Sequence, residues 1–146
     1  MPNADTGTTT GGVRLGWVIL HVADVATALA WYERAFGLTR RFIDPTGQYG
    51  ELDTGATTLA MASHALAQGN LGAAAEPPGL RPAGMEIALV CDHLEATWVR
   101  ALAAGAEPVQ APRRQPWGQQ VGWVRSPEGA LIELCEPVPA PEPAQD

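Results

Sequence analysis

Residues 18–37, VILHVADVATALAWYERAFG, decide the fold, because their hydrophobic pattern changes period within a few residues. Residues 18–22 form an apolar run with one polar member, His21, which is typical of a short β-strand. The next segment predicts a helix, with Asp24 placed to cap its start and Gly37 to end it. Apolar residues recur along one face of this helix at spacings of four, three and four: Val25, Leu29, Tyr32 and Phe36.

The same order of elements recurs later in the chain. Asp92 and Gly105 bracket a second helical segment, and each lies 68 residues after its counterpart in the first segment. Residues 86–91 form the apolar run of a strand before it. A repeat of this length outweighs any single motif, and it predicts an α+β fold of two βαβββ modules. Three further strands are expected in each module, at 41–43, 49–53 and 57–62, and at 108–110, 119–125 and 131–135.

The 146 residues are therefore expected to divide into two modules and three connecting or terminal segments. Residues 13–63 make the first module and residues 85–137 the second. The Pro-, Gly- and Ala-rich residues 64–84 are expected to be a linker. Residues 1–12 are expected to be a flexible N-terminal tail and residues 138–146 a Pro-rich C-terminal tail.

Composition excludes several classes of function. Nine basic residues against sixteen acidic ones give a net charge of −7, which disfavours binding to nucleic acid or to an anionic membrane. The sequence has no apolar stretch long enough to span a membrane and no N-terminal pattern of a secretory signal, so a cytoplasmic location is expected. Cys91 and Cys135 lie in strand-like apolar runs and are expected to be reduced, buried thiols.

Several short segments then carry a family resemblance. They are HVADV (21–25), EIALVCD (86–92), PWGQ (116–119) and SPEGALIEL (126–134). In this order the sequence resembles the vicinal oxygen chelate superfamily, which includes glyoxalase I, bleomycin-resistance proteins and extradiol dioxygenases. The resemblance covers about residues 14–137, and PWGQ resembles the bleomycin-resistance-like branch.

The resemblance implies that the modules form half-barrels around a cavity, with the helices outside, and that the protein is a homodimer. It places the family's four metal-ligand positions at Trp17, Ala60, Glu86 and Glu133. Tryptophan and alanine cannot ligate a metal, and two carboxylates alone make a poor transition-metal site. No cofactor is therefore expected, although a divalent ion recruited by Glu86, Glu133 and His21 remains an alternative.

Three residues are candidates for catalysis: His21, Glu86 and Glu133. A histidine on an inward strand face is suited to general base catalysis, or else to a structural hydrogen bond in the core. If the two glutamates approach one site, their repulsion raises the pKa of one of them and leaves an acid and a base. The alternative is a structural role for each glutamate beside an arginine, Arg14 or Arg125.

Five residues are candidates for contact with a ligand: Trp17, Ile19, Ala60, Trp117 and Gln120. Gln120 is included because a tight turn over residues 126–129 would pair Trp123 with Ile132. In that register Gln120 shares the face of Glu133, and Trp123 packs under the helix. Glu51 and Asp53 are expected on a solvated strand face, with a position facing the cavity as the alternative.

These observations predict a protein that acts on a small, largely apolar organic molecule in the cavity between the modules. The predicted chemistry is metal-independent acid–base catalysis, by isomerisation, ring opening or closure, elimination or hydrolysis. One alternative is a protein of the bleomycin-resistance type that binds and sequesters a drug or natural product. Another is a divalent-metal-dependent lyase or dioxygenase.

Overall fold

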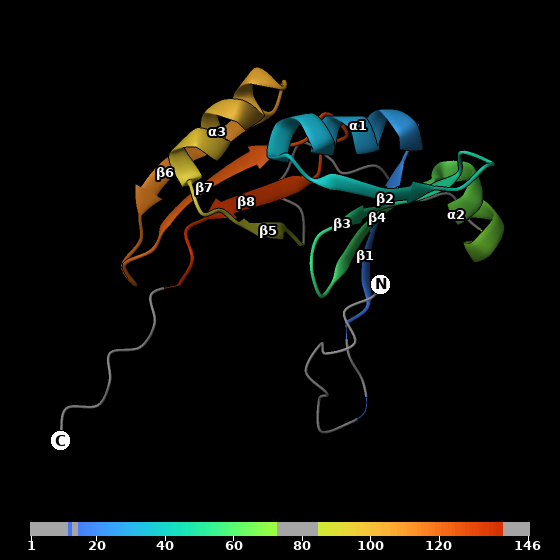
Figure 1. Ribbon diagram of the computed structural model, residues 1–146, viewed down its shortest axis with the longest axis horizontal. Helices are drawn as coiled ribbons and strands as arrows, with labels where there is room; N and C mark the ends of the chain where they lie inside the picture. The colour runs from blue at the N-terminus through green and yellow to red at the C-terminus, as the bar shows by residue number, and fades with distance from the viewer. Residues whose placement is uncertain (1–11, 13–14, 73–84, 139–146) are drawn as a thin grey trace. The chain divides into compact units, whose positions relative to one another are not determined.

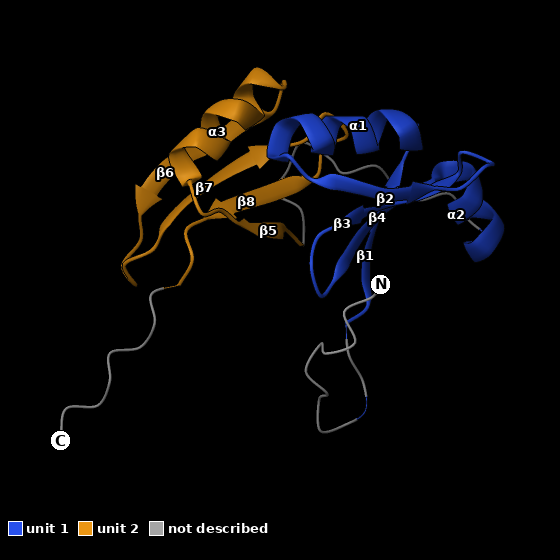
Figure 2. Cartoon of the chain, viewed as in Figure 1, with its two compact units in different colours: residues 1–77 blue, residues 78–146 orange. Residues whose placement is uncertain are grey.

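The computed structural model describes residue 12, residues 15–72 and residues 85–138. The chain divides into two compact units, residues 1–77 and 78–146 (Figure 2). Each unit holds one four-stranded sheet, with two described helices in unit 1 and one in unit 2, as the α+β prediction required. Arg14, most of the expected tails and the second half of the expected linker fall outside the described residues.

Unit 1 has the predicted βαβββ order followed by one additional helix. Its sheet has the strand order β1-β4-β3-β2, in which β1 runs parallel to β4 and the other neighbours are antiparallel. The additional helix, α2, begins inside the expected linker, and its N-terminus is capped by the hydroxyl of Ser63. The elements are β1 (Trp17–Val22), α1 (Val25–Phe36), β2 (Thr39–Ile43), β3 (Tyr49–Asp53), β4 (Thr58–Ser63) and α2 (His64–Leu71).

Helix α1 covers one face of this sheet, and the face opposite α1 is here termed the open face (Figure 1). The carboxylate of Asp24 accepts a hydrogen bond from the backbone N–H of Thr27 at 2.8 Å, and Gly37 ends the helix at φ 69°. A Cβ atom at Gly50 of β3 would lie 2.5 Å from Leu29 Cδ1, so the helix packs directly on a side-chain-free position. The predicted cap and stop of this helix are both confirmed.

Unit 2 repeats the βαβββ order, with sheet order β5-β8-β7-β6 and α3 packed on one face (Figure 1). Helix α3 ends before Gly105, which has φ 96°. At its start, His93 occupies the N-cap without a side-chain hydrogen bond, so the expected cap by Asp92 is not formed. No described helix of either unit has the length and apolar character needed to cross a membrane. The elements are β5 (Ile87–Val90), α3 (Leu94–Ala103), β6 (Glu107–Arg114), β7 (Gln120–Arg125) and β8 (Leu131–Cys135).

The predicted register between β7 and β8 is wrong by one residue. Trp123 pairs with Glu133, and Val124 pairs with Ile132. The turn is longer than expected, because Ser126 N–H bonds to the carbonyl of Ala130 at 2.9 Å. Trp123 therefore shares the face of Glu133 instead of packing under the helix. Strand alternation now separates Gln120 from that face, so the register argument for Gln120 as a ligand contact no longer holds.

The two cysteines lie at the ends of neighbouring parallel strands of unit 2. Both are free and buried, as predicted. The backbone N–H of Cys91 donates to the carbonyl of Cys135 at 2.7 Å, which continues the β5–β8 pairing by one residue. Burial raises the pKa of both thiols, so both are poor nucleophiles at neutral pH.

Candidate functional site on the open sheet faces

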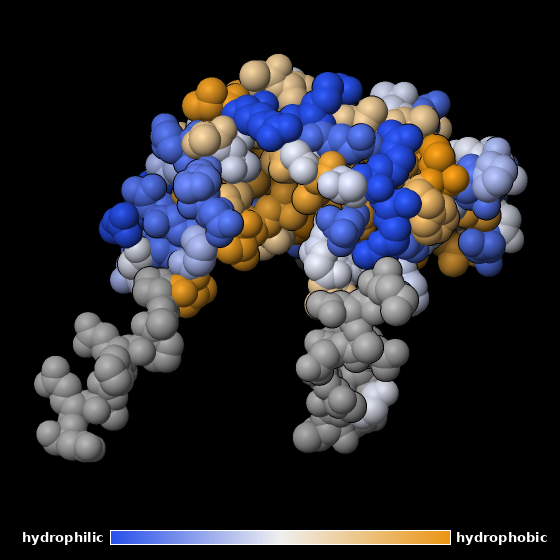
Figure 3. All heavy atoms as spheres, viewed as in Figure 1, coloured by the Kyte–Doolittle hydropathy of each residue, from blue (hydrophilic) through white to orange (hydrophobic). Residues whose placement is uncertain are grey.

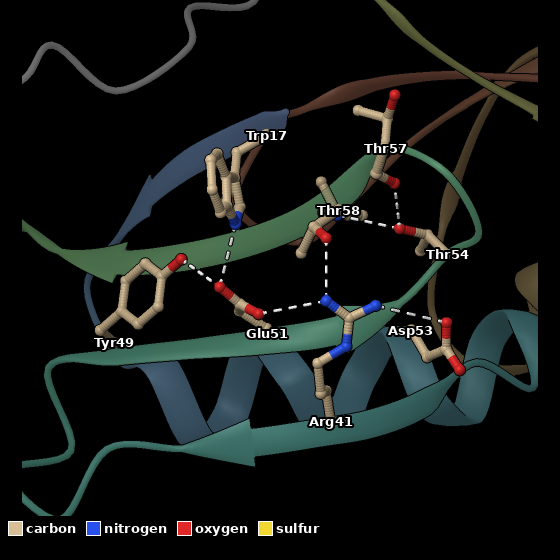
Figure 4. Close-up of polar contacts among 9 residues, drawn as sticks. Trp17, Arg41, Tyr49, Glu51, Asp53, Thr54, Thr57 and Thr58 are labelled. Carbon is tan, nitrogen blue, oxygen red and sulfur yellow. Dashed lines mark hydrogen bonds and ion pairs between the residues drawn. The ribbon is translucent and has the colours of Figure 1, made fainter. Parts of the chain in front are cut away.

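The open face of unit 1 is organised around one buried carboxylate, that of Glu51 on β3. Strand β4 lies between β1 and β3, and its Ala60 pairs with both Ile19 and Glu51. The side chain of Trp17 reaches across this central strand, and its indole N–H donates to Glu51 Oε2 at 3.0 Å (Figure 4). The hydroxyl of Tyr49 donates to the same oxygen at 2.7 Å. Two side chains from different strands therefore share one acceptor.

The guanidinium of Arg41 completes this cluster. The pairing of β2 with β3 shifts between Arg40 and Phe42, so Arg41 is the extra residue of a β-bulge. Its Nη1 lies 3.3 Å from Glu51 Oε1 and donates to Thr58 Oγ1 at 3.0 Å (Figure 4). Nothing in the sequence pattern indicates this bulge, and the site role of Arg41 was missed for that reason.

Glu51 is only 8 % exposed, so the expectation that it lies on a solvated strand face is wrong. A carboxylate is stable in such a position when hydrogen bonds and a nearby cation replace its hydration, as they do here. Burial raises the pKa of the Tyr49 phenol, and its hydrogen bond to Glu51 raises it further. Tyr49 therefore remains a hydrogen-bond donor throughout the physiological pH range.

Unit 2 carries a related arrangement on its own open face. The indole N–H of Trp123, on β7, donates to Glu86 Oε2 at 2.7 Å. Glu86 lies exposed just before β5, and β8 with Glu133 runs between β5 and β7. Burial raises the pKa of Glu133, and the negative charge of Glu86 raises it further. The two predicted carboxylates of this unit therefore lie close enough to influence each other.

The remaining predicted residues are distributed over both units. In unit 1, Ile19 is half exposed, His21 is partly buried opposite Ala62, and Ala60 has no exposed surface. In unit 2, Trp117 lies exposed in the hairpin between β6 and β7, with its indole N–H donating to Gln119 Oε1 at 2.9 Å. The structure thus places Trp17, Ile19, His21 and Ala60 on one face, and Glu86 and Glu133 on another.

Arg125, the described arginine considered as a partner for a glutamate, donates from Nη1 to the carbonyl of Gly129 at 3.1 Å. Ion pairs among the described residues include those formed by the carboxylates of Glu33, Glu51, Asp53 and Glu136.

The residue types do not fit a resident transition metal. Among the described residues, no three His, Cys, Asp or Glu side chains gather closely enough to hold a metal ion. At the positions that the resemblance implies, Trp17 and Ala60 have no metal-ligating atom. The carboxylates of Glu86 and Glu133 lack the imidazole or thiolate partners that such metals favour.

The repeated βαβββ order places this chain among the α+β proteins that are built from two such modules. Residues 14–134 match the model of the Glyoxalase/Bleomycin resistance protein/Dioxygenase superfamily, and the chain belongs to this superfamily. Among curated protein sequences, none matches the chain with significance.

Solved structures give the same fold. A glyoxalase-related enzyme from Fulvimarina pelagi is similar with a TM-score of 0.73 and 20 % identity, over 85 % of this chain and 88 % of that one. An enzyme of the glyoxalase/bleomycin resistance protein/dioxygenase family from Burkholderia phytofirmans PsJN is similar with a TM-score of 0.72 and 21 % identity, over 85 % of this chain and 98 % of that one. TioX from Micromonospora sp. ML1 is similar with a TM-score of 0.64 and 26 % identity, over 85 % of this chain and 98 % of that one.

Proposed function

We propose that the protein acts on a small, largely apolar organic molecule by acid–base catalysis, with Glu133 as the acid and Glu86 as the base. One arrangement carries the proposal: Glu133 pairs with Trp123 across β7 and β8, and the indole N–H of Trp123 donates to Glu86 Oε2 at 2.7 Å. In this arrangement, burial together with the Glu86 charge raises the pKa of Glu133. A raised pKa favours the protonated form of Glu133, and a carboxylic acid next to a carboxylate is a combination that transfers protons in both directions.

The expected proton transfers use these residues, the substrate and solvent water, which is also the second reactant in a hydrolysis. Glu86 Oε1 takes a proton from the substrate, while the indole N–H of Trp123 holds Glu86 Oε2. Glu133 gives its proton to the substrate atom on which negative charge develops. The proton that Glu86 gained and the one that Glu133 lost are then exchanged through solvent. Isomerisation, ring opening or closure, elimination and hydrolysis all include such a step.

Ligand screening by tryptophan fluorescence, followed by turnover assays of the compounds that bind, tests this proposal. For a compound that is turned over, Glu133→Gln is expected to lower kcat by about 10²–10⁴-fold while affinity changes little. Asp92→Asn, an exposed acid outside the pair, is the matched control. Unchanged turnover in Glu133→Gln contradicts the acid role. Loss of activity with a chelator, and recovery with added divalent metal, favours the metal-dependent alternative.

A second candidate function is sequestration of a drug or natural product, as expected for the bleomycin-resistance-like branch. The exposed indole of Trp17, which is oriented by its bond to Glu51, favours it because a fixed ring is a preorganised surface for stacking. In this case compounds bind without being turned over, and Glu133→Gln weakens affinity only modestly. Trp17→Leu is expected to weaken binding more than Glu133→Gln.

A further inference from the structure

Three aromatic side chains lie near Glu51 in unit 1: its two hydrogen-bond donors and Phe42, which pairs with it across β2 and β3. Trp17 and Tyr49 both donate to Glu51 Oε2, so one oxygen fixes the edges of both side chains. The ring centroids of Phe42 and Tyr49 lie 6.0 Å apart. Trp17 remains 57 % exposed and Phe42 44 % exposed. Because its N–H is already bonded, Trp17 offers a ligand the π face of its indole.

The charged groups of this cluster, two carboxylates and one guanidinium, have a net negative charge. Arg41 is shared between two carboxylates, with Nη1 3.3 Å from Glu51 Oε1 and Nη2 3.5 Å from Asp53 Oδ1. The side chain of Asp53 is 64 % exposed, so its charge faces solvent. In the space-filling view, hydrophilic side chains border hydrophobic ones over β2 and β3 (Figure 3). A negative cluster bordered by exposed rings attracts cations and disfavours anions.

Arg41 and the two aromatic donors contact different oxygens of Glu51. Arg41 contacts Oε1 of Glu51 and is tied to Thr58, whereas Trp17 and Tyr49 contact Oε2. Figure 4 shows the two aromatic residues on one side of the carboxylate and the guanidinium on the other. A ligand at the rings therefore approaches the carboxylate without first meeting the guanidinium.

We infer that this face binds an organic ammonium ion, with its cationic group against the rings of Trp17, Tyr49 and Phe42 and near the Glu51 carboxylate. Aromatic faces around a carboxylate are the arrangement that recognises alkylated ammonium groups, because the ring quadrupoles and the negative charge act together. The inferred site lies in unit 1 and does not depend on acid–base catalysis by Glu86 and Glu133 in unit 2.

The test compares choline with 3,3-dimethylbutan-1-ol, which has the same shape but no charge. Both are titrated into the full-length protein while the indole N–H signal of Trp17, assigned with Trp17→Phe, is followed by NMR. Choline is expected to bind about tenfold more tightly than the alcohol and to shift the Trp17 signal. Equal affinity for the two compounds, or binding of choline without a shift at Trp17, overturns the inference. So does the absence of choline binding, or tighter binding of acetate than of choline.

Variants separate charge from packing. Glu51→Gln keeps an acceptor for Trp17 and Tyr49 but removes the charge, and it is expected to weaken choline binding about tenfold. Glu95→Gln removes an exposed charge on α3 of the other unit and serves as the control, with no expected loss. Phe42→Leu leaves every hydrogen bond of Glu51 intact, so it tests the site even if Glu51→Gln fails to fold. Wild-type affinity in folded Phe42→Leu and Glu51→Gln overturns the inference.

Discussion

The two units contain the same indole–carboxylate bond with its partners exchanged. In unit 1 the indole comes from the first strand, at Trp17, and the carboxylate from the third, at Glu51. In unit 2 the carboxylate comes from the segment just before the first strand, at Glu86, and the indole from the third, at Trp123. In both units the bond crosses the strand that lies between them. The backbone thus fixes where such a bond forms, whereas the side chains decide which end carries the charge.

This exchange has a chemical consequence. In unit 1 the carboxylate is on the third strand, where it is buried and compensated by Arg41. In unit 2 the carboxylate is at the exposed edge, and a second one, Glu133, lies on the central strand. The first arrangement is a buried, hydrogen-bonded carboxylate in a cluster of two carboxylates and one guanidinium. The second is an exposed carboxylate whose charge raises the pKa of a second one. The predictions below compare matched positions of the two units.

The largest expected effect on stability is that of replacing a glycine by alanine in the third strand of a unit, β3 or β7. Gly50 and Gly122 occupy corresponding positions, each just before the residue that makes the indole–carboxylate bond. Gly50→Ala is expected to lower the free energy of unfolding by about 1–3 kcal/mol, because its Cβ would lie 2.5 Å from Leu29 Cδ1. Gly122→Ala is expected to cost less, since its nearest contacts are at 3.0–3.1 Å. Urea unfolding measures both, and a larger loss in Gly122→Ala would contradict this order.

The next largest effect on stability is expected when the carboxylate bonded to an indole is removed from each unit. Glu51→Ala is expected to destabilise the protein by about 1–2 kcal/mol, because it leaves Arg41 and Tyr49 without their buried partner. Glu86→Ala is expected to change stability by less than about 0.5 kcal/mol, since Glu86 is exposed. Thermal unfolding of the two variants compares them directly. Equal losses would show that the two bonds contribute alike.

A smaller difference is expected between the aspartates that precede the two main helices. Asp24→Ala removes a formed cap and should lower stability, whereas Asp92→Ala should not, because Asp92 is not the N-cap of α3. The backbone N–H of Thr27 holds the pKa of Asp24 below its usual value of 3.8. The stabilisation by Asp24 is therefore present above pH 3.8 and is lost as the pH falls through the lowered pKa. Acid unfolding curves of wild type and Asp24→Ala should converge there.

The smallest expected effect concerns the pH dependence due to Glu133. Its pKa is raised above 4.5 in the folded protein, so folding favours its protonated form. Its unfavourable contribution to stability therefore grows as the pH rises from 4.5 through the raised pKa. Glu133→Gln should remove this component and be relatively more stable at neutral pH than at pH 4. In Glu86→Gln, carbon-detected NMR titration should show a lower pKa for Glu133, and an unchanged pKa would refute the coupling.

Much of the fold is predictable because its signals are local. The Asp24 cap, the Gly37 stop and the apolar spacing between them identify α1, and the 68-residue recurrence extends the pattern to unit 2. Helix α2 escaped prediction because Ala67 is its one buried residue, which leaves almost no apolar periodicity. The β7–β8 register was missed because it depends on one extra residue in the turn that ends at Ala130.

The candidate site was predictable only in part. The sequence indicates Glu133 as a candidate because a carboxylate flanked by apolar residues is conspicuous in a strand, and its role remains a prediction. Glu51 and Arg41 were missed as partners, since their contact depends on a bulge and on side chains that reach across a neighbouring strand. Such contacts are set by tertiary register, which no local pattern encodes.

The indole–carboxylate bonds also join parts of the chain that are distant in sequence, 34 residues apart in unit 1 and 37 in unit 2. Contacts between residues so far apart in sequence are slow to form, because the entropy of closing the intervening loop is lost before the contact stabilises the fold. Trp17 and Trp123 should therefore reach their final fluorescence only when the parallel strand pairing of their own unit is complete. Each unit thus contains an intrinsic optical probe of its own strand pairing, and single-tryptophan variants would time that pairing in the two units independently.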